Sequence, residues 1–490
     1  MKNFLMILLF LASTTVFAQR ITVTGTVTDE GGSPLPGTTV LVKGTTVGVT
    51  TDANGKYSVD VSSRTVTLVF SFIGFVTQEV PVENRSVVDV ILEAEITGLD
   101  EVIVVGYGTQ KKSDITGTVA SMPKERLEMA PNLSIAQAIQ GAVPGVMIQS
   151  SNSGANPDQT ILVRGRNSIT ANNDPLIIVD GIPYGGRISD VNPSDIQSIE
   201  VLKDASAAAI YGSRGSNGVI LITTKEGIIG KVSFSAESKF TIMDVTKTSR
   251  PLTGSEFYDF KMTRYAPSMT ASEKQIYLAG EGVDWVKLGL RTGQSQEHNL
   301  SVSGGFKDTK YYFGGGLLDI KSVAKGDNFR RFSSRINLES KIISWISLGT
   351  RTQLTFDDES GANANFENLI EKNPLTKAFD EDGKYTIYPW PENIIVGNPL
   401  EPLLYDDLDK SYQILTNNYA IIDFPFIKGL NYRLNTGIRM RYTDRAQYRA
   451  RNTQSGLEGL GRASLSNSVT NSTIIENILS YTRVFGVHNV

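Results

Sequence analysis

The chain has 490 residues, a formal net charge of −4 and no cysteine. This length allows several domains, and 45 glycines with 40% hydrophobic residues are typical of folded, β-rich protein rather than disorder. The near-neutral charge without a lysine- or arginine-rich run argues against nucleic acid as a partner, and the absence of cysteine excludes disulfides and thiolate metal sites.

The first residues have the pattern of a secretory signal peptide. Lys2 precedes a short apolar core at Phe4–Leu11, and Val16-Phe17-Ala18 resemble a small-residue cleavage site. The core is far shorter than the roughly 20 apolar residues of a membrane-spanning helix. We therefore expect residues 1–18 to be removed, which leaves Gln19 first, and the mature protein to be exported.

Short β-rich runs split by turns follow at 21–92, and they predict a small β-sandwich at residues 19–96. Asn54-Gly55 favours a hairpin turn, because both residue types tolerate positive φ. A calcium loop could begin at Asp52, but its glycine comes too early and no glutamate closes it, so we expect no calcium site. The expected strands are Ile21–Thr28, Val40–Lys43, Lys56–Val61, Thr65–Phe72 and Val87–Leu92.

The segment Leu99–Lys112 joins this module to the next domain. Its residues Val102–Val105 predict a strand that is apolar on both faces, and Gly106 and Gly108 end it. Two interpretations are open at this point. The strand is either buried in a neighbouring domain, or it pairs its backbone with the sheet edge of another protein.

Residues 113–228 predict a compact α/β domain with glycine-rich loops. Ser134 and Gln137 form a capping box for a short helix that ends at Gly141. Asp180-Gly181-Ile182-Pro183 reads as a turn. A second helix is expected to begin at Asn192–Ile196 and to pass into an apolar stretch at Ile199–Leu202, and Asp204 is a cap for a third helix at Ala205–Tyr211. The expected strands are Val146–Gln149, Gln159–Val163, Leu176–Val179 and Val219–Thr224.

These glycines do not form a nucleotide-binding loop. The chain has no G-x-x-x-x-G-K-[S/T] motif, and the spacing of Gly212, Gly215 and Gly218 differs from G-x-G-x-x-G. It also has no G-x-S-x-G motif, and its two histidines, His298 and His488, lie far apart. We therefore expect neither an enzyme nor a cofactor or metal site.

From Lys231 onward, long runs alternate between apolar and polar residues. Most runs are about 11 to 13 residues long, as in tilted strands that cross a bilayer, and they predict a membrane-embedded β-barrel from residue 229. A soluble sheet packed on one face is the alternative. The runs are Val232–Ile242, Asn299–Phe306, Thr309–Asp319, Phe329–Lys341, Trp345–Phe356, Tyr412–Phe424 and Leu430–Tyr442, with a further one near Ile474–Val484.

The polar face of one run contains Arg433, Arg439 and Arg441. We hypothesise that these side chains face the barrel lumen and contact polar or anionic groups of a ligand. Ordinary solvation of the lumen is the alternative. The proline-rich insertion Asp357–Asp409 is expected to be an extracellular loop.

Three motifs resemble the SusC/RagA family of TonB-linked outer-membrane transporters: D-E-V-I-V-V-G-Y-G-T-Q-K-K at 100–112, P-L-I-I-V-D-G-I-P at 175–183, and the 31-residue stretch at 195–225. Residues 25–59 resemble the carboxypeptidase regulatory-like domain, a transthyretin-like sandwich without catalysis. The resemblance implies a TonB box at Glu101, Val102, Ile103, Val104, Val105 and Gly106. It implies plug elements at Arg164, Gly165, Asp180, Gly181, Asp204, Arg214 and Gly215.

The implied fold is mainly β: a small sandwich, the TonB box and linker at 97–112, an α/β plug at 113–228, and part of a large antiparallel barrel at 229–490. The implied function is TonB-dependent import of an oligomeric nutrient, a glycan or a peptide. The implied partners are TonB with its ExbB–ExbD energising complex, a SusD-like surface lipoprotein and outer-membrane lipid, with the N-terminal domains periplasmic or inside the barrel. Siderophore or metal-chelate uptake, and surface binding without transport, are the alternatives. Since the family's barrel has roughly 22 strands, we expect a truncated, inactive piece of the transporter.

Overall fold

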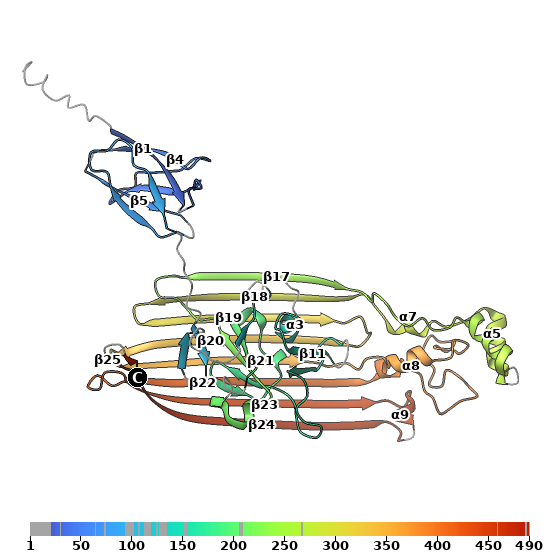
Figure 1. Cartoon of the computed structure of the whole chain (residues 1–490). Helices are drawn as coiled ribbons and strands as arrows, with labels where there is room; N and C mark the ends of the chain where they lie inside the picture. The colour runs from blue at the N-terminus through green and yellow to red at the C-terminus, as the bar shows by residue number, and fades with distance from the viewer. Residues whose placement is uncertain are drawn as a thin grey trace, which may run out of the picture. The chain divides into compact units, whose positions relative to one another are not determined.

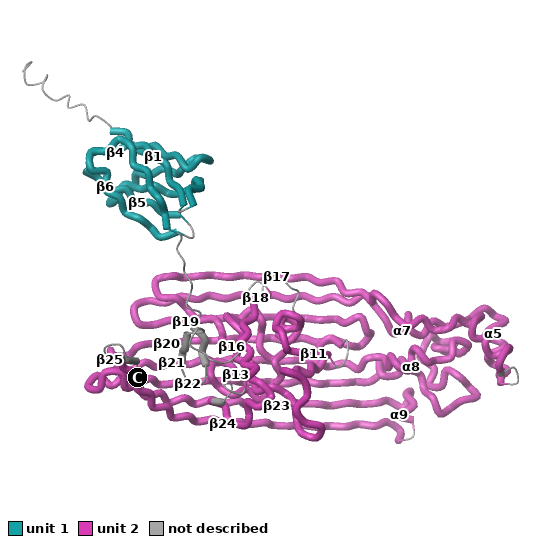
Figure 2. The backbone as a smooth tube through the Cα atoms, viewed as in Figure 1, with its two compact units in different colours: residues 1–102 teal, residues 103–490 magenta. Residues whose placement is uncertain are grey.

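The computed structural model contains two compact units, residues 1–102 and 103–490 (Figure 2). The expected signal peptide (1–18, before Gln19), Glu101, Gly106, Ser134 and most of the expected helix after Asp204 lie outside the described residues. The structure describes residues 21–29, 31–63, 65–72, 75–93, 102–105, 108–111, 119–123, 126, 135–150, 154–204, 209–265, 268–457, 459–485 and 488–489.

The first unit is a β-sandwich, as the turn-divided pattern predicts. One sheet has the order β4-β1-β7 and the other has the order β3-β2-β5-β6. Alternate side chains of both sheets, among them Val23, Leu68 and Phe70, are fully buried between them. The strands are β1 (Ile21–Asp29), β2 (Thr39–Val42), β3 (Gly48–Thr50), β4 (Lys56–Val61), β5 (Thr67–Ser71), β6 (Gln78–Pro81) and β7 (Val90–Leu92).

The α/β domain of the second unit is built on a five-stranded sheet with the order β10-β15-β16-β13-β14. Its elements are β10 (Val119–Ser121), α3 (Ile135–Ile139), β11 (Val146–Ser150), β12 (Gln159–Val163), β13 (Leu176–Val179), β14 (Ile182–Tyr184), η2 (Ile188–Asp190), η3 (Pro193–Asp195), β15 (Ile196–Leu202), η4 (Ala209–Gly215) and β16 (Val219–Thr224). Helix α3 packs its buried Ile135 and Ile139 on the sheet, and β11 and β12 form a separate hairpin.

Two local predictions for this domain were wrong. Ile182 and Pro183 belong to strand β14, so only Asp180-Gly181 form the turn; both have positive φ, 51° and 87°. The expected helix at Asn192–Ile196 is only the 3₁₀ turn η3, because the apolar residues that follow pair with β16 as strand β15. Tertiary strand pairing overrides a weak local helix signal here.

The second unit also contains an eight-stranded antiparallel sheet in which every strand pairs with its neighbour in sequence (Figure 1). The strands are β17 (Ser233–Met243), β18 (Gly293–Phe306), β19 (Thr309–Lys321), β20 (Asn328–Ile343), β21 (Ile346–Asp358), β22 (Asp406–Asp423), β23 (Leu430–Arg449) and β24 (Arg462–Tyr481). They are longer than common globular strands. We call this sheet the wall.

The alternation along the wall strands separates two faces. Apolar side chains such as Phe332, Leu348 and Met440 are about half exposed on one face. Polar side chains of the other face, such as Arg335 and Gln353, are buried against the α/β domain. The predicted alternation is therefore confirmed, with the polar face directed inward.

The two ends of the wall differ. Connections 307–308, 344–345 and 424–429 form a turn end, whereas 244–292, 322–327, 359–405 and 450–461 form a loop end. The loop end also contains helices that the sequence pattern missed: α5 (Gly254–Tyr265), α6 (Ala271–Ala279), α7 (Trp285–Gly289), α8 (Phe366–Glu371), η6 (Glu401–Leu404) and α9 (Gln454–Leu457). The run expected at Ile474–Val484 lies in the second half of the 20-residue strand β24 as far as Tyr481, and Val484 belongs to β25 (Val484–Phe485).

Among the helices that the structure describes, none has the length and apolar character that a bilayer crossing requires. Two short strands near the end of the chain, β25 (Val484–Phe485) and β26 (His488–Asn489), pair with one another.

Candidate functional site

The strand predicted to seek a partner is present as β8 (Val102–Val105). Among the described strands it pairs with β9 (Gly108–Lys111), in a two-stranded sheet that includes no strand of the sandwich or of the α/β sheet. Its pairing with the sheet edge of another protein stays a prediction. The roles predicted for Glu101 and Gly106 concern residues outside the described part of the chain.

The main polar site lies where the α/β domain meets the inner face of the wall. Three aspartates of the domain, Asp180, Asp190 and Asp195, are nearly fully buried there. Asp180 lies in the turn between β13 and β14, and Asp190 and Asp195 lie in the 3₁₀ turns η2 and η3 of the connection from β14 to β15; all three carboxylates contact side chains of the wall. We call these residues the docking aspartates.

Asp180 follows β13 in the tight turn to β14. The hydroxyl of Thr224 in β16 lies 2.9 and 3.0 Å from its two carboxylate oxygens, and the Thr224 backbone N–H donates to Oδ1 at 2.9 Å. From the wall, Arg335 Nη1 is 3.3 Å from Oδ2 and Arg351 Nη1 is 3.8 Å from Oδ1. Asp180 is therefore oriented by its own domain and neutralised by the wall.

Asp195 ends η3 and contacts β19 and β20. The hydroxyl of Tyr312 donates to its Oδ1 at 2.7 Å, and Arg335 Nε lies 3.5 Å from its Oδ2. Asn192 caps η3 by accepting from Ser194 N at 3.0 Å, and its amide donates to Asn299 Oδ1 of β18 at 2.9 Å. The short turn is thus fixed to three wall strands.

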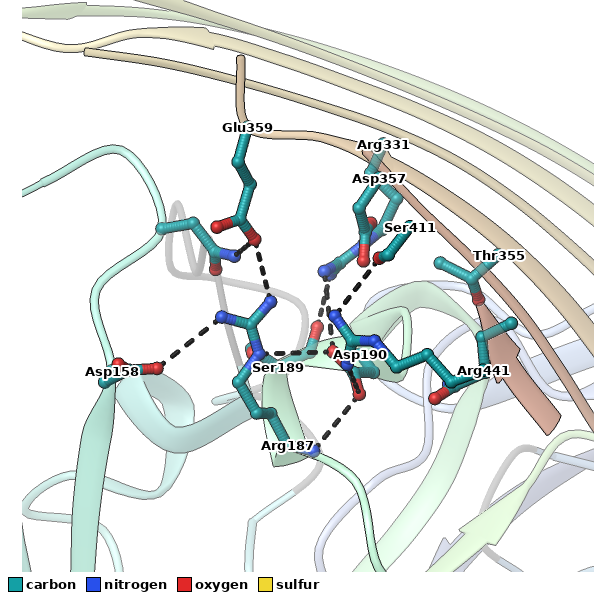
Figure 3. A network of polar contacts seen from close by, with 12 residues as sticks. Asp158, Arg187, Ser189, Asp190, Arg331, Thr355, Asp357, Glu359, Ser411 and Arg441 are labelled. Atoms are coloured by element: carbon teal, nitrogen blue, oxygen red, sulfur yellow. Dashed lines mark hydrogen bonds and ion pairs between the residues drawn. The ribbon is translucent and has the colours of Figure 1, made fainter. Parts of the chain in front are cut away.

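Asp190 is the centre of a network at the loop end (Figure 3). Tyr184 donates to its Oδ2 at 2.8 Å, Arg441 Nη1 lies 3.4 Å from the same oxygen, and Arg331 Nη2 lies 3.9 Å from Oδ1. Burial, and secondly the charge of Asp190, raise the pKa of Tyr184 well above its ordinary value. The phenol therefore stays neutral and remains a donor.

Two arginines extend this network. Arg331 Nε is 2.7 Å from Asp357 Oδ1, and its guanidinium also donates to the Ser189 carbonyl of the domain. Arg187 of the domain places Nη2 2.8 Å from Glu359 Oε1 and Nη1 3.5 Å from Asp158 Oδ1 (Figure 3). The pair of Arg187 with Glu359 therefore joins the domain to the wall, and Asp357 of the wall neutralises the buried charge of Arg331.

Glycines of the wall leave room for the docked domain. A Cβ atom on Gly314 would lie 2.6 Å from Asp195 Oδ1, and one on Gly316 would lie 2.5 Å from Asn192 Nδ2. On β23, a Cβ on Gly437 would lie 2.7 Å from Cγ2 of Ile182. Real Cβ contacts are not this short, so the backbone of β19 and β23 can be approached only where these positions are glycine.

The other predicted residues of the α/β domain lie away from the docking aspartates. Arg164 and Asp204 form an ion pair that links the end of β12 to the segment after β15. Arg164 and Gly165 both have positive φ, 60° and 95°. Arg214 and Gly215 lie on η4, whose regular geometry is interrupted at Gly212. Their functional roles remain predictions.

The three arginines predicted to face a ligand instead contact protein groups. Arg441 pairs with Asp190, and Arg439 donates to the Gly185 carbonyl at 3.2 Å. Arg433 lies over the ring of Tyr419 and donates to Asn435. Two of the three thus contact the α/β domain in this structure, and contact with a ligand remains a prediction.

Sequence reasoning missed the principal wall arginines, Arg331, Arg335 and Arg351. A signal was present, because Arg331, Ser333, Arg335 and Asn337 alternate along β20 on the face that meets the domain. The arrangement has the chemistry of a separable, charge-paired contact. Within the described ranges, no three His, Cys, Asp or Glu side chains come together as a metal site.

Comparison with known proteins gives concordant matches. The TonB-dependent Receptor Plug Domain matches residues 111–219, and the CarboxypepD_reg-like domain matches residues 23–104. The TonB-dependent receptor P3 of Formosa agariphila is 33% identical over 518 residues, which cover 100% of this chain and 49% of that protein. TonB-dependent receptor SusC of Bacteroides thetaiotaomicron is 38% identical over 331 residues, covering 66% of this chain and 32% of SusC.

Among solved structures, the RagAB peptide importer in the 'open-open' state has a TM-score of 0.68 at 26% identity, covering 79% of this chain and 47% of that one. The chain spans about half the length, or less, of these relatives. The relatives are receptors and transporters, not enzymes.

Proposed function

Because the chain belongs to the SusC/RagA-like TonB-dependent receptors, we propose that the whole protein imports an oligomeric nutrient, a glycan or a peptide, across the outer membrane. The observation that carries this proposal is the charge-paired contact between the docking aspartates and the wall arginines. The two charged groups of an ion pair attract one another strongly while the contact excludes water, but both groups are well hydrated once water enters the contact. A plug held in this way closes the pore at rest and can separate when it is pulled.

The element on which TonB pulls is the TonB box, Glu101 to Gly106. Its described part, β8, pairs with the four-residue strand β9. An isolated two-stranded hairpin is marginally stable in water. The sheet of TonB, energised by ExbB–ExbD, can therefore replace β9 as the partner of β8 by strand addition.

The orientation of the protein in the outer membrane follows from the difference between the turn end and the loop end of the wall. In bacterial barrels the short turns are periplasmic and the longer loops are extracellular. The loop end with α5 to α9 then faces the medium and the SusD-like lipoprotein. The apolar face of the wall meets outer-membrane lipid, and the N-terminal domains are periplasmic or inside the barrel. We place the plug at 113–228 and the barrel from 229 onward.

Substitution within β8 tests the proposal in the whole protein. Val104→Pro removes a backbone donor that strand addition needs, whereas Val104→Thr keeps both the donor and the strand propensity. We expect Val104→Pro, like deletion of Glu101 to Gly106, to abolish uptake from a panel of labelled peptides and glycans, and Val104→Thr to retain it.

The panel also separates the alternatives. Uptake that survives both the deletion and Val104→Pro would reject energised import through this box. Ligand binding without any uptake by the unaltered protein would favour the surface-binding alternative. Uptake of iron chelates alone would favour siderophore transport.

A further inference from the structure

Three side chains of the loop end come together around one buried carboxylate. Lys261 of α5 and Glu273 of α6 belong to the 244–292 connection, and Asn373 belongs to the 359–405 connection. Glu273 is fully buried, and the side chain of Lys261 is only 14% exposed. Lys261 Nζ lies 2.7 Å from Glu273 Oε1, and Asn373 Nδ2 donates to the same oxygen at 2.6 Å. An amine and an amide are therefore neighbours on one carboxylate oxygen.

Apolar groups of this chain surround the amine of Lys261. Its Nζ lies 5.3 Å from the ring centroid of Phe257 and 5.2 Å from that of Trp390. The buried Ile276 and Leu375 belong to an apolar cluster against which Phe257 packs. In such a site a proton can pass from the ammonium to the carboxylate, because the neutral pair needs less solvation than the charged one. A desolvated, uncharged lysine is a nucleophile.

The amide of Asn373 is oriented for attack at its carbonyl carbon. Its Oδ1 accepts a hydrogen bond from Leu375 N at 2.9 Å. Negative charge develops on this oxygen when a nucleophile adds to the carbon, and a fixed backbone N–H stabilises that charge. The carboxylate is also fixed, since Glu273 Oε2 accepts from Thr270 N at 2.8 Å. The site thus contains a nucleophile, a proton carrier and an oriented carbonyl group.

We propose that Lys261 Nζ and Asn373 Cγ become joined by an isopeptide bond, with Glu273 transferring the protons. Glu273 first takes a proton from the ammonium, and the amine then attacks Cγ and forms the new C–N bond. Glu273 gives its proton to Nδ2 and takes one from the attacking nitrogen, so the Cγ–Nδ2 bond breaks and ammonia leaves. The ammonia takes the last proton from Glu273. An ammonium and a primary amide thereby become a secondary amide and an ammonium ion, without any oxidant.

The bond would tie the 244–292 connection to the 359–405 connection. The chain has no cysteine, so a disulfide cannot join these two loops. An isopeptide bond supplies a covalent link between them from residues that are already in contact. It also holds α5 and α6 on the segment that follows α8.

Mass spectrometry of the purified protein tests the bond directly. After allowance for the substitution, we expect the unaltered protein to be lighter by one ammonia molecule than Lys261→Arg. Arginine keeps the positive charge, but its guanidinium does not lose a proton and cannot attack. Cyclisation of an N-terminal Gln19 also releases ammonia, but it changes both proteins equally. A digest of the unaltered protein should contain one branched peptide that joins Lys261 to Asn373.

A cleavable form of the protein gives a second measurement. A protease site inserted in the 307–308 turn lies between the two bonded residues in the sequence. After cleavage and denaturation, the otherwise unaltered protein should migrate as one branched species, whereas Lys261→Arg should separate into two fragments. Lys377→Arg is the matched control, because Lys377 is an exposed lysine of the 359–405 connection, and it should stay joined. Glu273→Gln should separate, since it removes the proton carrier.

The unaltered protein decides the outcome, so the test does not depend on whether a variant folds. An intact mass without the loss of ammonia, no branched peptide, or two fragments after cleavage would each overturn the inference. A joined species in Lys261→Arg would also overturn it, because the link would then lie elsewhere. None of these measurements involves TonB or a ligand, so the result is independent of the import proposal.

Discussion

Arg335 of β20 lies 3.3 Å from Asp180 and 3.5 Å from Asp195, so one wall guanidinium contacts two aspartates from separate turns of the plug. Its side chain is only 1% exposed. Arg335 and Asp180 are 155 residues apart in the chain.

Replacing Arg335 by methionine should strongly destabilise the docked plug, because Asp180 and Asp195 would lose their shared buried cation. Breaking a buried pair from one side costs about 3–5 kcal/mol. Arg330→Met on the same strand is the control, since Arg330 is 52% exposed and pairs with Asp319 at 2.7 Å. Its loss should cost less than about 1 kcal/mol. Denaturant unfolding followed by tryptophan fluorescence measures both, and equal losses would contradict the assignment.

Adding a methyl group to the glycine run of β19 should have opposite effects at adjacent positions. Gly314→Ala places a Cβ 2.6 Å from Asp195 Oδ1, whereas nothing lies within 4 Å of a Cβ on Gly315. We expect Gly314→Ala to destabilise the protein by about 1–3 kcal/mol through overpacking. Gly315→Ala should be neutral or slightly stabilising. If melting shows equal stability for both variants, the plug does not lie against Gly314 as described.

The N-terminal sandwich offers a prediction independent of the plug. The hydroxyl of Tyr57, a residue 4% exposed, donates to Val88 O at 2.8 Å, so Tyr57→Phe should cost about 1 kcal/mol. Thr22→Val, which removes an exposed hydrogen bond to Asp60, should change stability by under about 0.5 kcal/mol. Hydrogen exchange measured by mass spectrometry on peptides from the first unit distinguishes the two, and faster exchange in the plug would contradict the independence of the units.

Because of Lys372, at the end of α8, we expect the folding stability to depend on pH. Burial lowers the pKa of Lys372 to about 8, although its ammonium donates to Gly397 O at 2.8 Å. The unfolded chain, with an ordinary lysine pKa near 10.5, therefore binds more protons between pH 8 and 10.5. The contribution of this group to stability should rise with pH across that window.

The check compares unaltered protein with Lys372→Met. The variant's melting temperature relative to that of the unaltered protein should fall as pH increases from 7 to 10, because only the unaltered lysine sheds its buried charge. A constant difference would show that Lys372 is not desolvated in the folded loop.

The strands and their faces were predictable because a strand's side-chain alternation is a local property with a period of two residues. The run beginning at Leu430 starts β23 at that residue. The residues at which the strands begin and end were harder to predict. Only the apolar second half of β24 was expected, since its polar first half, from Arg462, is defined by backbone pairing with β23.

Features that depend on distant partners could not be read from the sequence. The loop-end helices have weak apolar periodicity of their own, and Trp285 of α7 is buried against Leu369 of α8, across the strands that separate them in the chain. Arginines on the inward face of an alternating strand cannot be told apart by sequence alone. Those of β23 were therefore chosen as candidates, whereas those of β20 and β21 were not. The sequence by itself determined most of the wall strands and their two faces. Only the tertiary structure decided which arginine meets which aspartate, because that depends on how the folded plug is placed against the wall.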